Sequence, residues 1–307
     1  MNVAADWGVP GGSPRAPVSG DYARVSGGTV TVAEGEGAGV NMWLVGNNAP
    51  GTTQLNLING SIGSLSVNAA QYSAYTAAFA SVQVTGRVTD TGYIKLGGVH
   101  GAPDTLNLTL SPFSTFVSAG AVTVLNGSKL LEGGGAHSSF ENDGTITTSG
   151  ASVLKFGSTV TGTGTISDNA AATGGGSKIE FEGGVGSGQT INLNAGTLQL
   201  DKPMAFHATI TALNASAAPV DGPTSGLGNG AIVLEHTGAD SAIFSANELV
   251  LKDAGVTVAD LHFSGLATIG TAQLWVGREA DGSTVVTGYA LPESHALYVS
   301  AMPTLLS

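Results

Sequence analysis

The chain has 307 residues, of which only 10% are charged, and a formal net charge of −12. This charged fraction is far below the roughly 25% typical of soluble domains. The negative net charge excludes nucleic acid as an expected partner, because a polyanion would be repelled. The chain has no cysteine, which excludes disulfides, thiolate metal sites and cysteine nucleophiles.

Short runs with period-two alternation predict strands of four to six residues along the whole chain. They occupy residues 28–32, 54–58, 81–85, 105–110, 121–125, 178–182, 190–193, 197–200, 231–234, 273–276 and 296–299. Glycine-rich and Asn-Gly sequences between the runs predict turns, among them Asn59-Gly60, Asn126-Gly127 and Gly133-Gly134-Gly135.

This pattern predicts an all-β fold, because helix-forming charged residues are scarce and Thr, Ser, Asn and Gly are abundant. More than a dozen short strands exceed what one sandwich accommodates, which favours a parallel β-solenoid. At about 20 residues per coil we expect roughly 13 to 15 coils, with an apolar column inside and polar ladders outside.

We divide the chain into four segments. Residues 1–26 are expected to form an N-terminal cap and first-coil segment, 27–212 the solenoid, 213–230 a loop or joint, and 231–307 a β-rich continuation of the solenoid. The Ala- and Tyr-rich segment 69–79 is a candidate for a short helix or a lateral insertion. From Met1 to Pro10 no signal peptide is visible, and no run of about 18 apolar residues predicts a transmembrane helix.

Two parts of the sequence carry a family resemblance. The chain opens with Asp6-Trp7, a Pro-rich stretch, Asp21-Tyr22-Ala23 and the run 27–32, and similar coil sequences return at 140–146, 160–166, 179–181, 188–191, 196–201 and 206–210. Over about the first 210 residues the chain thus resembles bacterial autotransporter-type passenger domains and related β-strand-repeat surface proteins. The resemblance implies a right-handed parallel β-helix, exported to the bacterial cell surface or medium and used in adhesion, aggregation or matrix formation.

Candidate catalytic and metal-binding residues are few. Glu180 and Glu182 share one outward strand face and could form the carboxylate pair of a glycosidase, although a solvated strand face is the favoured interpretation. The six histidines lie at no metal-ligand spacing; they are His100, His137, His207, His236, His262 and His295. Asp143-Gly144 and Asp281-Gly282 are typical of tight turns. We therefore assign no catalytic, cofactor-binding or metal residue and expect no cofactor.

Two functions remain open at this point. The first is a secreted or cell-surface structural or adhesive protein without enzymatic activity. Its expected partners are other copies of itself, in filaments or a biofilm matrix, and surface glycans. The alternative is a carbohydrate-active β-helix, either a polysaccharide lyase or hydrolase or a glycan-binding receptor-recognition fragment.

Overall fold

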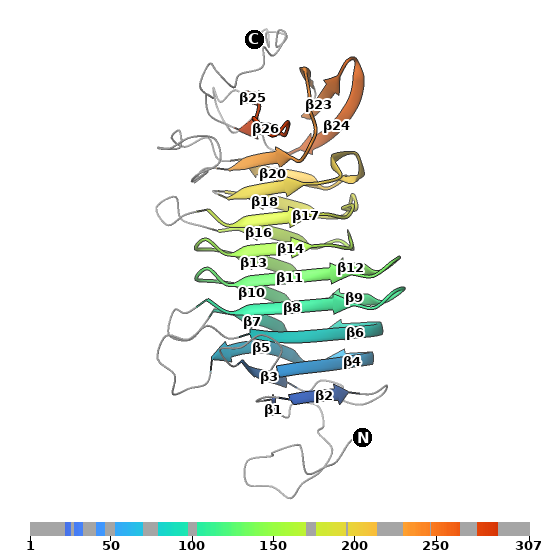
Figure 1. Ribbon diagram of the computed structural model, residues 1–307, viewed down its shortest axis with the longest axis vertical. Coiled ribbons are helices and arrows are strands. Elements are labelled where there is room, and N and C mark those ends of the chain that lie inside the picture. The colour runs from blue at the N-terminus through green and yellow to red at the C-terminus, as the bar shows by residue number, and fades with distance from the viewer. Residues whose placement is uncertain are drawn as a thin grey trace, which may run out of the picture.

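The protein is a rod of stacked β-strands that run across its long axis (Figure 1). The computed structural model describes residues 22–25, 28–32, 41–46, 53–69, 79–97, 103–169, 176–194, 196–213, 230–245, 247–264 and 275–287. Most of its strand pairs are parallel, as the sequence predicts for a β-solenoid.

Sheet A contains twelve strands. Their order is β1 (Tyr22–Val25), β3 (Asn41–Gly46), β5 (Ser64–Ala69), β7 (Tyr93–Leu96), β10 (Ala121–Val124), β13 (Thr145–Thr148), β16 (Thr165–Asp168), β18 (Thr190–Leu193), β20 (Thr209–Leu213), β24 (Val256–Phe263), β23 (Glu248–Asp253) and β22 (Ser241–Ser245).

Sheet B contains fourteen strands. Its main path is β15 (Thr159–Thr161), β12 (Ser139–Asn142), β9 (Thr115–Ser118), β6 (Phe79–Asp90), β8 (Thr105–Leu110), β11 (Lys129–Gly134), β14 (Val153–Phe156), β17 (Lys178–Phe181), β19 (Thr197–Leu200), β21 (Ala231–Leu234), β26 (Thr284–Thr287) and β25 (Trp275–Arg278). Beside β6 lie β4 (Thr53–Ile62) and then β2 (Gly28–Val32).

The long strand β6 divides sheet B into two ladders. Its first half pairs with β8, which begins ladder B1, formed by β8, β11, β14, β17, β19 and β21. Its second half pairs with β9, which begins ladder B2, formed by β9, β12 and β15 and extended by single bridges at Val185 and Phe206. Each coil therefore has three sides, which the chain follows in the order sheet A, ladder B1, ladder B2.

The number of coils is smaller than predicted. On sheet A between Tyr93 and Thr209, one coil takes from 19 residues, Thr190 to Thr209, up to 28 residues, Tyr93 to Ala121, rather than a constant 20. About five coils are described between Tyr93 and Thr209, and β1, β3 and β5 extend the parallel stack beyond them. The estimate of 13 to 15 coils was wrong, because insertions lengthen several coils and the last strands do not stack in parallel.

A row of buried phenylalanines runs along the inside of the solenoid. The centroids of neighbouring rings in this row lie 5.0 to 6.1 Å apart. The row consists, in order, of Phe116, Phe140, Phe156, Phe181 and Phe206. Alternation explains their placement, because in a strand such as Val153–Phe156 every second side chain points inward. The continuous apolar column expected from the sequence is confirmed.

Two predicted turns are parts of strands instead. Asn59-Gly60 lies inside β4, where the pairing register shifts and Asn59 has a φ of 38°. Gly133 and Gly134 belong to β11 and pair with Thr109 and Leu110. In both cases pairing with the neighbouring coil outweighs the local turn preference. Asn126-Gly127 is a turn as predicted, with both residues at positive φ.

At its C-terminal end the solenoid changes from parallel to antiparallel pairing. Strand β21 still stacks in parallel on β19, but β26 and β25 then add antiparallel strands to sheet B. Sheet A ends in an antiparallel unit of β24, β23 and β22, which joins the stack through two parallel residue pairs between β24 and β20. Figure 1 shows β23 and β24 rising beyond the stacked coils.

Several expectations lie outside the described residues. They include residues 70–78 of the candidate helix or insertion, most of the joint at 213–230 and most of the N-terminal segment, so the segment boundaries stay predictions. Among the described residues, one 3-10 turn, η2 (Pro203–Ala205), lies between β19 and β20. No helix in the described part of the chain has the length and apolar character to span a bilayer. The right-handed winding stays a prediction.

Candidate functional site

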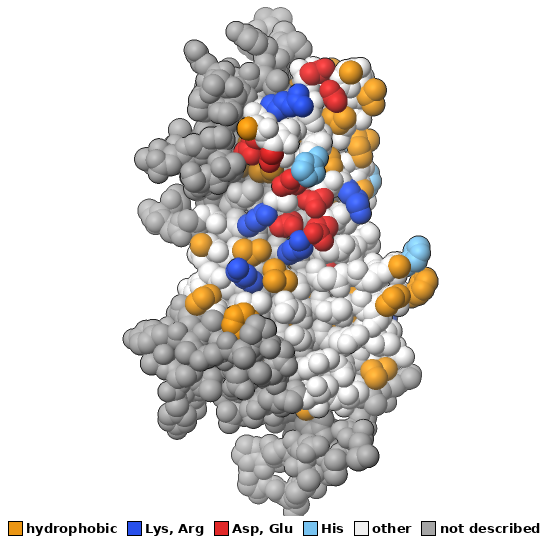
Figure 2. All heavy atoms as spheres, viewed as in Figure 1, with side chains coloured by type: hydrophobic (Ala, Val, Ile, Leu, Met, Phe, Trp, Pro, Cys, Tyr) orange, Lys and Arg blue, Asp and Glu red, His pale blue; other side chains and the backbone are white. Residues whose placement is uncertain are grey.

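The two glutamates predicted as a possible acid pair lie on the outer face of ladder B1, beside two lysines. Lys155 on β14 is the register partner of Glu180 on β17, and its Nζ lies 2.9 Å from Glu180 Oε1 and 2.5 Å from Glu182 Oε1. Lys178 Nζ lies 2.8 Å from the other oxygen of Glu180. Figure 2 shows acidic and basic side chains gathered together on this face.

The ion pairs determine the charge state of Glu180. Burial of its side chain, which is 12% exposed, opposes ionisation, but hydrogen bonds from Lys178 and Lys155 together outweigh burial and hold the pKa of Glu180 below its usual value. The carboxylates of Glu182 and Glu180 in turn raise the pKa of Lys155. A glycosidase acid needs a raised pKa. The ion pairs therefore hold Glu180 ionised, without the raised pKa of a glycosidase acid, and Glu182 shares Lys155 with it.

Asp201 adds a third carboxylate to this cluster. One oxygen from each of Glu180, Glu182 and Asp201 lies within 4.8 Å of the others. The Lys155 ammonium contacts two of these three residues, so a cation is already supplied by the protein.

A shallow groove lies next to the cluster, at the corner where ladder B1 meets ladder B2. This corner groove has a volume of about 560 Å³ and is lined by Gly135, His137, Ser138, Gly157, Ser158, Thr159, Gly183, Gly184, Val185, Gly186, Lys202, Ala205 and His207. Its lining holds no carboxylate. It could accommodate part of an extended ligand, but it lacks the pair of acids that glycoside hydrolysis requires.

Two buried carboxyl groups with raised pKa values were not recognised in the sequence. Burial raises the pKa of Asp90 to about 7, although a hydrogen bond from the Gly92 N–H lowers it in part. Burial also raises the pKa of Glu132, although a hydrogen bond from the Ser158 N–H opposes this shift. Asp90 Oδ2 and Glu132 Oε1 have no hydrogen-bond partner. A signal was present, because alternation places Glu132 on the same side of β11 as buried Leu130.

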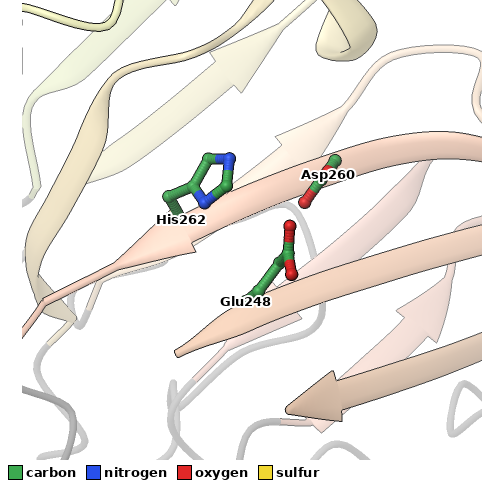
Figure 3. Close-up of side chains that lie close together, drawn as sticks. All are labelled: Glu248, Asp260 and His262. Carbon is green, nitrogen blue, oxygen red and sulfur yellow. The ribbon is translucent and has the colours of Figure 1, made fainter. Parts of the chain in front are cut away.

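The histidines are distributed over several surroundings. His137 stacks on Phe113 with ring centroids 5.2 Å apart, His207 lines the corner groove, and His236 Nε2 lies 3.9 Å from a Glu235 oxygen. His262 is close to Glu248 and Asp260, a grouping that sequence spacing missed because Glu248 comes from the neighbouring strand (Figure 3). His100 and His295 lie outside the described residues.

One of the two turn aspartates, Asp281, acts as predicted. Asp143 Oδ1 accepts the N–H of Thr163 at 3.1 Å, and Asp281 Oδ1 accepts the N–H of Ser283 at 2.9 Å. The latter hydrogen bond is the main cause of a lowered pKa at Asp281. The Asp281 carboxylate therefore stabilises a local backbone turn, whereas Asp143 bonds to the backbone of the next coil.

Comparisons with known proteins give no match among protein-family models, curated proteins or solved structures. The strand topology alone thus defines the class: the protein is a β-solenoid with an antiparallel C-terminal end.

Proposed function

We propose that this protein is an exported structural or adhesive solenoid whose contact surface is the outer face of sheet A. The observation that carries the proposal is a ladder of hydroxyl side chains at one register position in four successive coils. This threonine ladder consists of Thr145, Thr165, Thr190 and Thr209. A second polar row runs beside it through Thr123, Thr147, Ser167 and Asn192.

The ladder suits repeated weak contacts. Parallel strands repeat about every 4.8 Å, so the hydroxyl groups form a regular array, and each can donate and accept a hydrogen bond. Several weak contacts made together can raise the apparent affinity by a factor on the order of 10² to 10⁴. Such a surface fits ligands with many hydroxyl groups, above all surface glycans, or the same face of another copy.

The charged cluster supports a non-enzymatic role. Glu180 and Glu182 both contact Lys155, so the acid pair first considered for glycan cleavage is held in ion pairs. Export to a bacterial surface is supported by the resemblance of the coil sequences to autotransporter-type passenger domains. The net charge of −12 disfavours nucleic acid as a partner.

Self-association is the second part of the proposal. Among the described strands, β22 and β25 end their sheets at the C-terminal side, and β1 and β2 end them at the other side. Strand edges with one neighbour can pair with another chain. We expect rods that lengthen with protein concentration under the electron microscope, and short rods of one constant length would contradict this part.

The test of the contact surface removes hydroxyl groups without changing side-chain shape. In one variant Thr145→Val, Thr165→Val and Thr190→Val are combined, and a matched control combines Thr115→Val, Ser139→Ala and Thr159→Val on the outer side of ladder B2. Retention on polysaccharide-coated beads and sedimentation are measured for both. Loss of at least tenfold in retention or self-association in the sheet A variant alone is expected. Equal retention and equal sedimentation of the two variants would overturn the assignment of sheet A as the contact surface.

The corner groove supports a second candidate, a carbohydrate-active solenoid. His137, Lys202 and His207 are positioned to contact an anionic or hydroxylated chain in the groove. Incubation with acidic and neutral polysaccharides tests this candidate, and new reducing ends or unsaturated products would favour it over the adhesive role.

A further inference from the structure

The outer face of the C-terminal end of sheet A carries a mixed group of metal-binding side chains. Glu248 on β23 pairs across the ladder with His262 on β24, and Asp260 precedes His262 by two residues, so alternation puts all three on one face. One ligand atom from each lies within 4.8 Å of the others. Figure 3 shows the carboxylates of Glu248 and Asp260 directed toward each other, with the imidazole beside them.

The three side chains lack a compensating positive charge within the described structure. None of the ion pairs among the described residues includes Glu248 or Asp260. Asp260 Oδ1 is also shielded from solvent and has no hydrogen-bond partner. Two carboxylates so close repel each other, and a buried oxygen without a hydrogen bond is destabilising, so this arrangement favours a bound cation.

A second carboxylate cluster in the same protein provides an internal comparison. At Glu180, Glu182 and Asp201 the carboxylate oxygens also lie within 4.8 Å of one another, but Lys155 and Lys178 supply ammonium groups at 2.5 to 2.9 Å. At Glu248 and Asp260 a histidine takes the neighbouring position instead of a lysine. Imidazole is a metal ligand when neutral, whereas an ammonium group has no lone pair to offer.

We propose that Glu248, Asp260 and His262 bind a divalent transition-metal ion of the zinc class. One imidazole nitrogen and two carboxylate oxygens suit Zn²⁺ or a similar first-row ion better than Ca²⁺, which prefers oxygen ligands alone. Three protein ligands leave a fourth tetrahedral position for water or for a group from a partner. His262 is exposed, which gives an ion access to the site.

The position of the site gives the ion a structural effect. His262 forms one of the two residue pairs through which β24 joins β20, and Glu248 begins β23. A metal ion bound here links β23 and β24 at the point where the antiparallel unit meets the parallel stack. It would hold the C-terminal end of the solenoid in register.

The test titrates the full chain with Zn²⁺ in a calorimeter and follows thermal unfolding with and without the metal. We expect one high-affinity site, a higher melting temperature with Zn²⁺, and reversal by a chelator. Asp260→Asn and His262→Gln should each weaken Zn²⁺ binding at least tenfold. Two controls should leave the affinity unchanged: His236→Gln, which alters another exposed histidine, and Asp201→Asn, which alters the other carboxylate cluster.

Two further measurements separate loss of metal binding from loss of folding and test whether His262 is a ligand. Circular dichroism without metal verifies that each variant is folded, and Co²⁺ in place of Zn²⁺ should give visible absorption bands that are lost in His262→Gln. Failure of the native chain to bind Zn²⁺ would overturn the proposal. Binding that survives both Asp260→Asn and His262→Gln, or that is lost in either control, would also overturn it.

Discussion

Lys155 lies directly across the strand ladder from Glu180, 25 residues later in the chain, and its ammonium also contacts Glu182. This pairing turns a potential acid pair into a network of fixed charges. It also connects two neighbouring coils through their outer faces, so it should contribute to the stability of the stack.

Replacement of Lys155 by methionine tests this contribution. We expect Lys155→Met to lower the free energy of unfolding at neutral pH by about 1 kcal/mol, a modest value because the lysine side chain is one-third exposed. The folded-state pKa of Glu180 lies below its usual 4.5, so its contribution is present above that value and is lost as the pH falls through the folded pKa. The difference between native protein and variant should therefore shrink in acid.

Chemical denaturation at several pH values measures this effect. Lys129→Met is the control, because Lys129 is exposed on the same ladder and takes part in no ion pair of the described residues. Its change should stay within about 0.5 kcal/mol. An equal loss in both variants, or a difference that is unchanged in acid, would contradict the role of the ion pairs.

Asp90 should make the protein more stable in mild acid than at alkaline pH. Its pKa is about 7 in the folded protein, against 3.8 in its usual state, so the folded protein retains a proton that the unfolded chain releases. The contribution of Asp90 to stability is then largest below pH 3.8 and falls as the pH rises toward 7, by up to about 1.4 kcal/mol per pH unit. Asp90→Asn should remove this fall and stabilise the protein at pH 8.

The measurement is the denaturation midpoint between pH 4 and pH 8 for the native chain, Asp90→Asn and Asp143→Asn. The last is a control, since Asp143 is an exposed aspartate. If Asp90→Asn follows the same pH dependence as the native protein, the buried carboxyl is not the group responsible.

The phenylalanine row predicts a large loss on truncation. Phe156 lies between Phe140 and Phe181, with ring centroids 5.0 and 5.3 Å away, so Phe156→Ala leaves a cavity in the column and should cost about 3 to 5 kcal/mol. Phe113→Ala is the matched control, because Phe113 is 76% exposed and its ring stacks on His137 outside the phenylalanine row. A similar loss for both substitutions would show that the row is not the core.

A pair of glycines tests how closely the coils approach each other. A Cβ atom at Gly183 would lie 2.1 Å from the carbonyl oxygen of Ser158, whereas a Cβ at Gly133 would meet nothing within 4 Å. Gly183→Ala should therefore lower the unfolding midpoint, and Gly133→Ala should be neutral or raise stability by up to about 1 kcal/mol. Thermal unfolding distinguishes the two, and equal midpoints would contradict this packing.

The strands were predictable where alternation is local. The runs at 105–110 and 190–193 coincide with β8 and β18, because a buried face is visible within six residues. The division of sheet B at β6 was not predictable, since it depends on which later strands pair with each half. The predicted number of coils was wrong because loops of unequal length change the number of residues per coil without changing the pattern within each strand.

The candidate sites show the same limit. Alternation placed Glu180 and Glu182 on one outward face, but their neutralisation depends on a register that brings Lys155 beside them. His262 meets Glu248 only through antiparallel pairing of β23 and β24, in a region where the sequence predicted continued stacking. Contacts set by register between coils are absent from any local pattern.

The most direct test of the contact surface uses the absence of native cysteine, which allows a single label to be placed without background. A spin label at Thr145→Cys on sheet A is compared with one at Thr159→Cys on ladder B2, as polysaccharide or additional unlabelled protein is added. The proposed adhesive role predicts that the label on sheet A becomes immobilised and the label on ladder B2 stays mobile. Immobilisation of the ladder B2 label alone would contradict it.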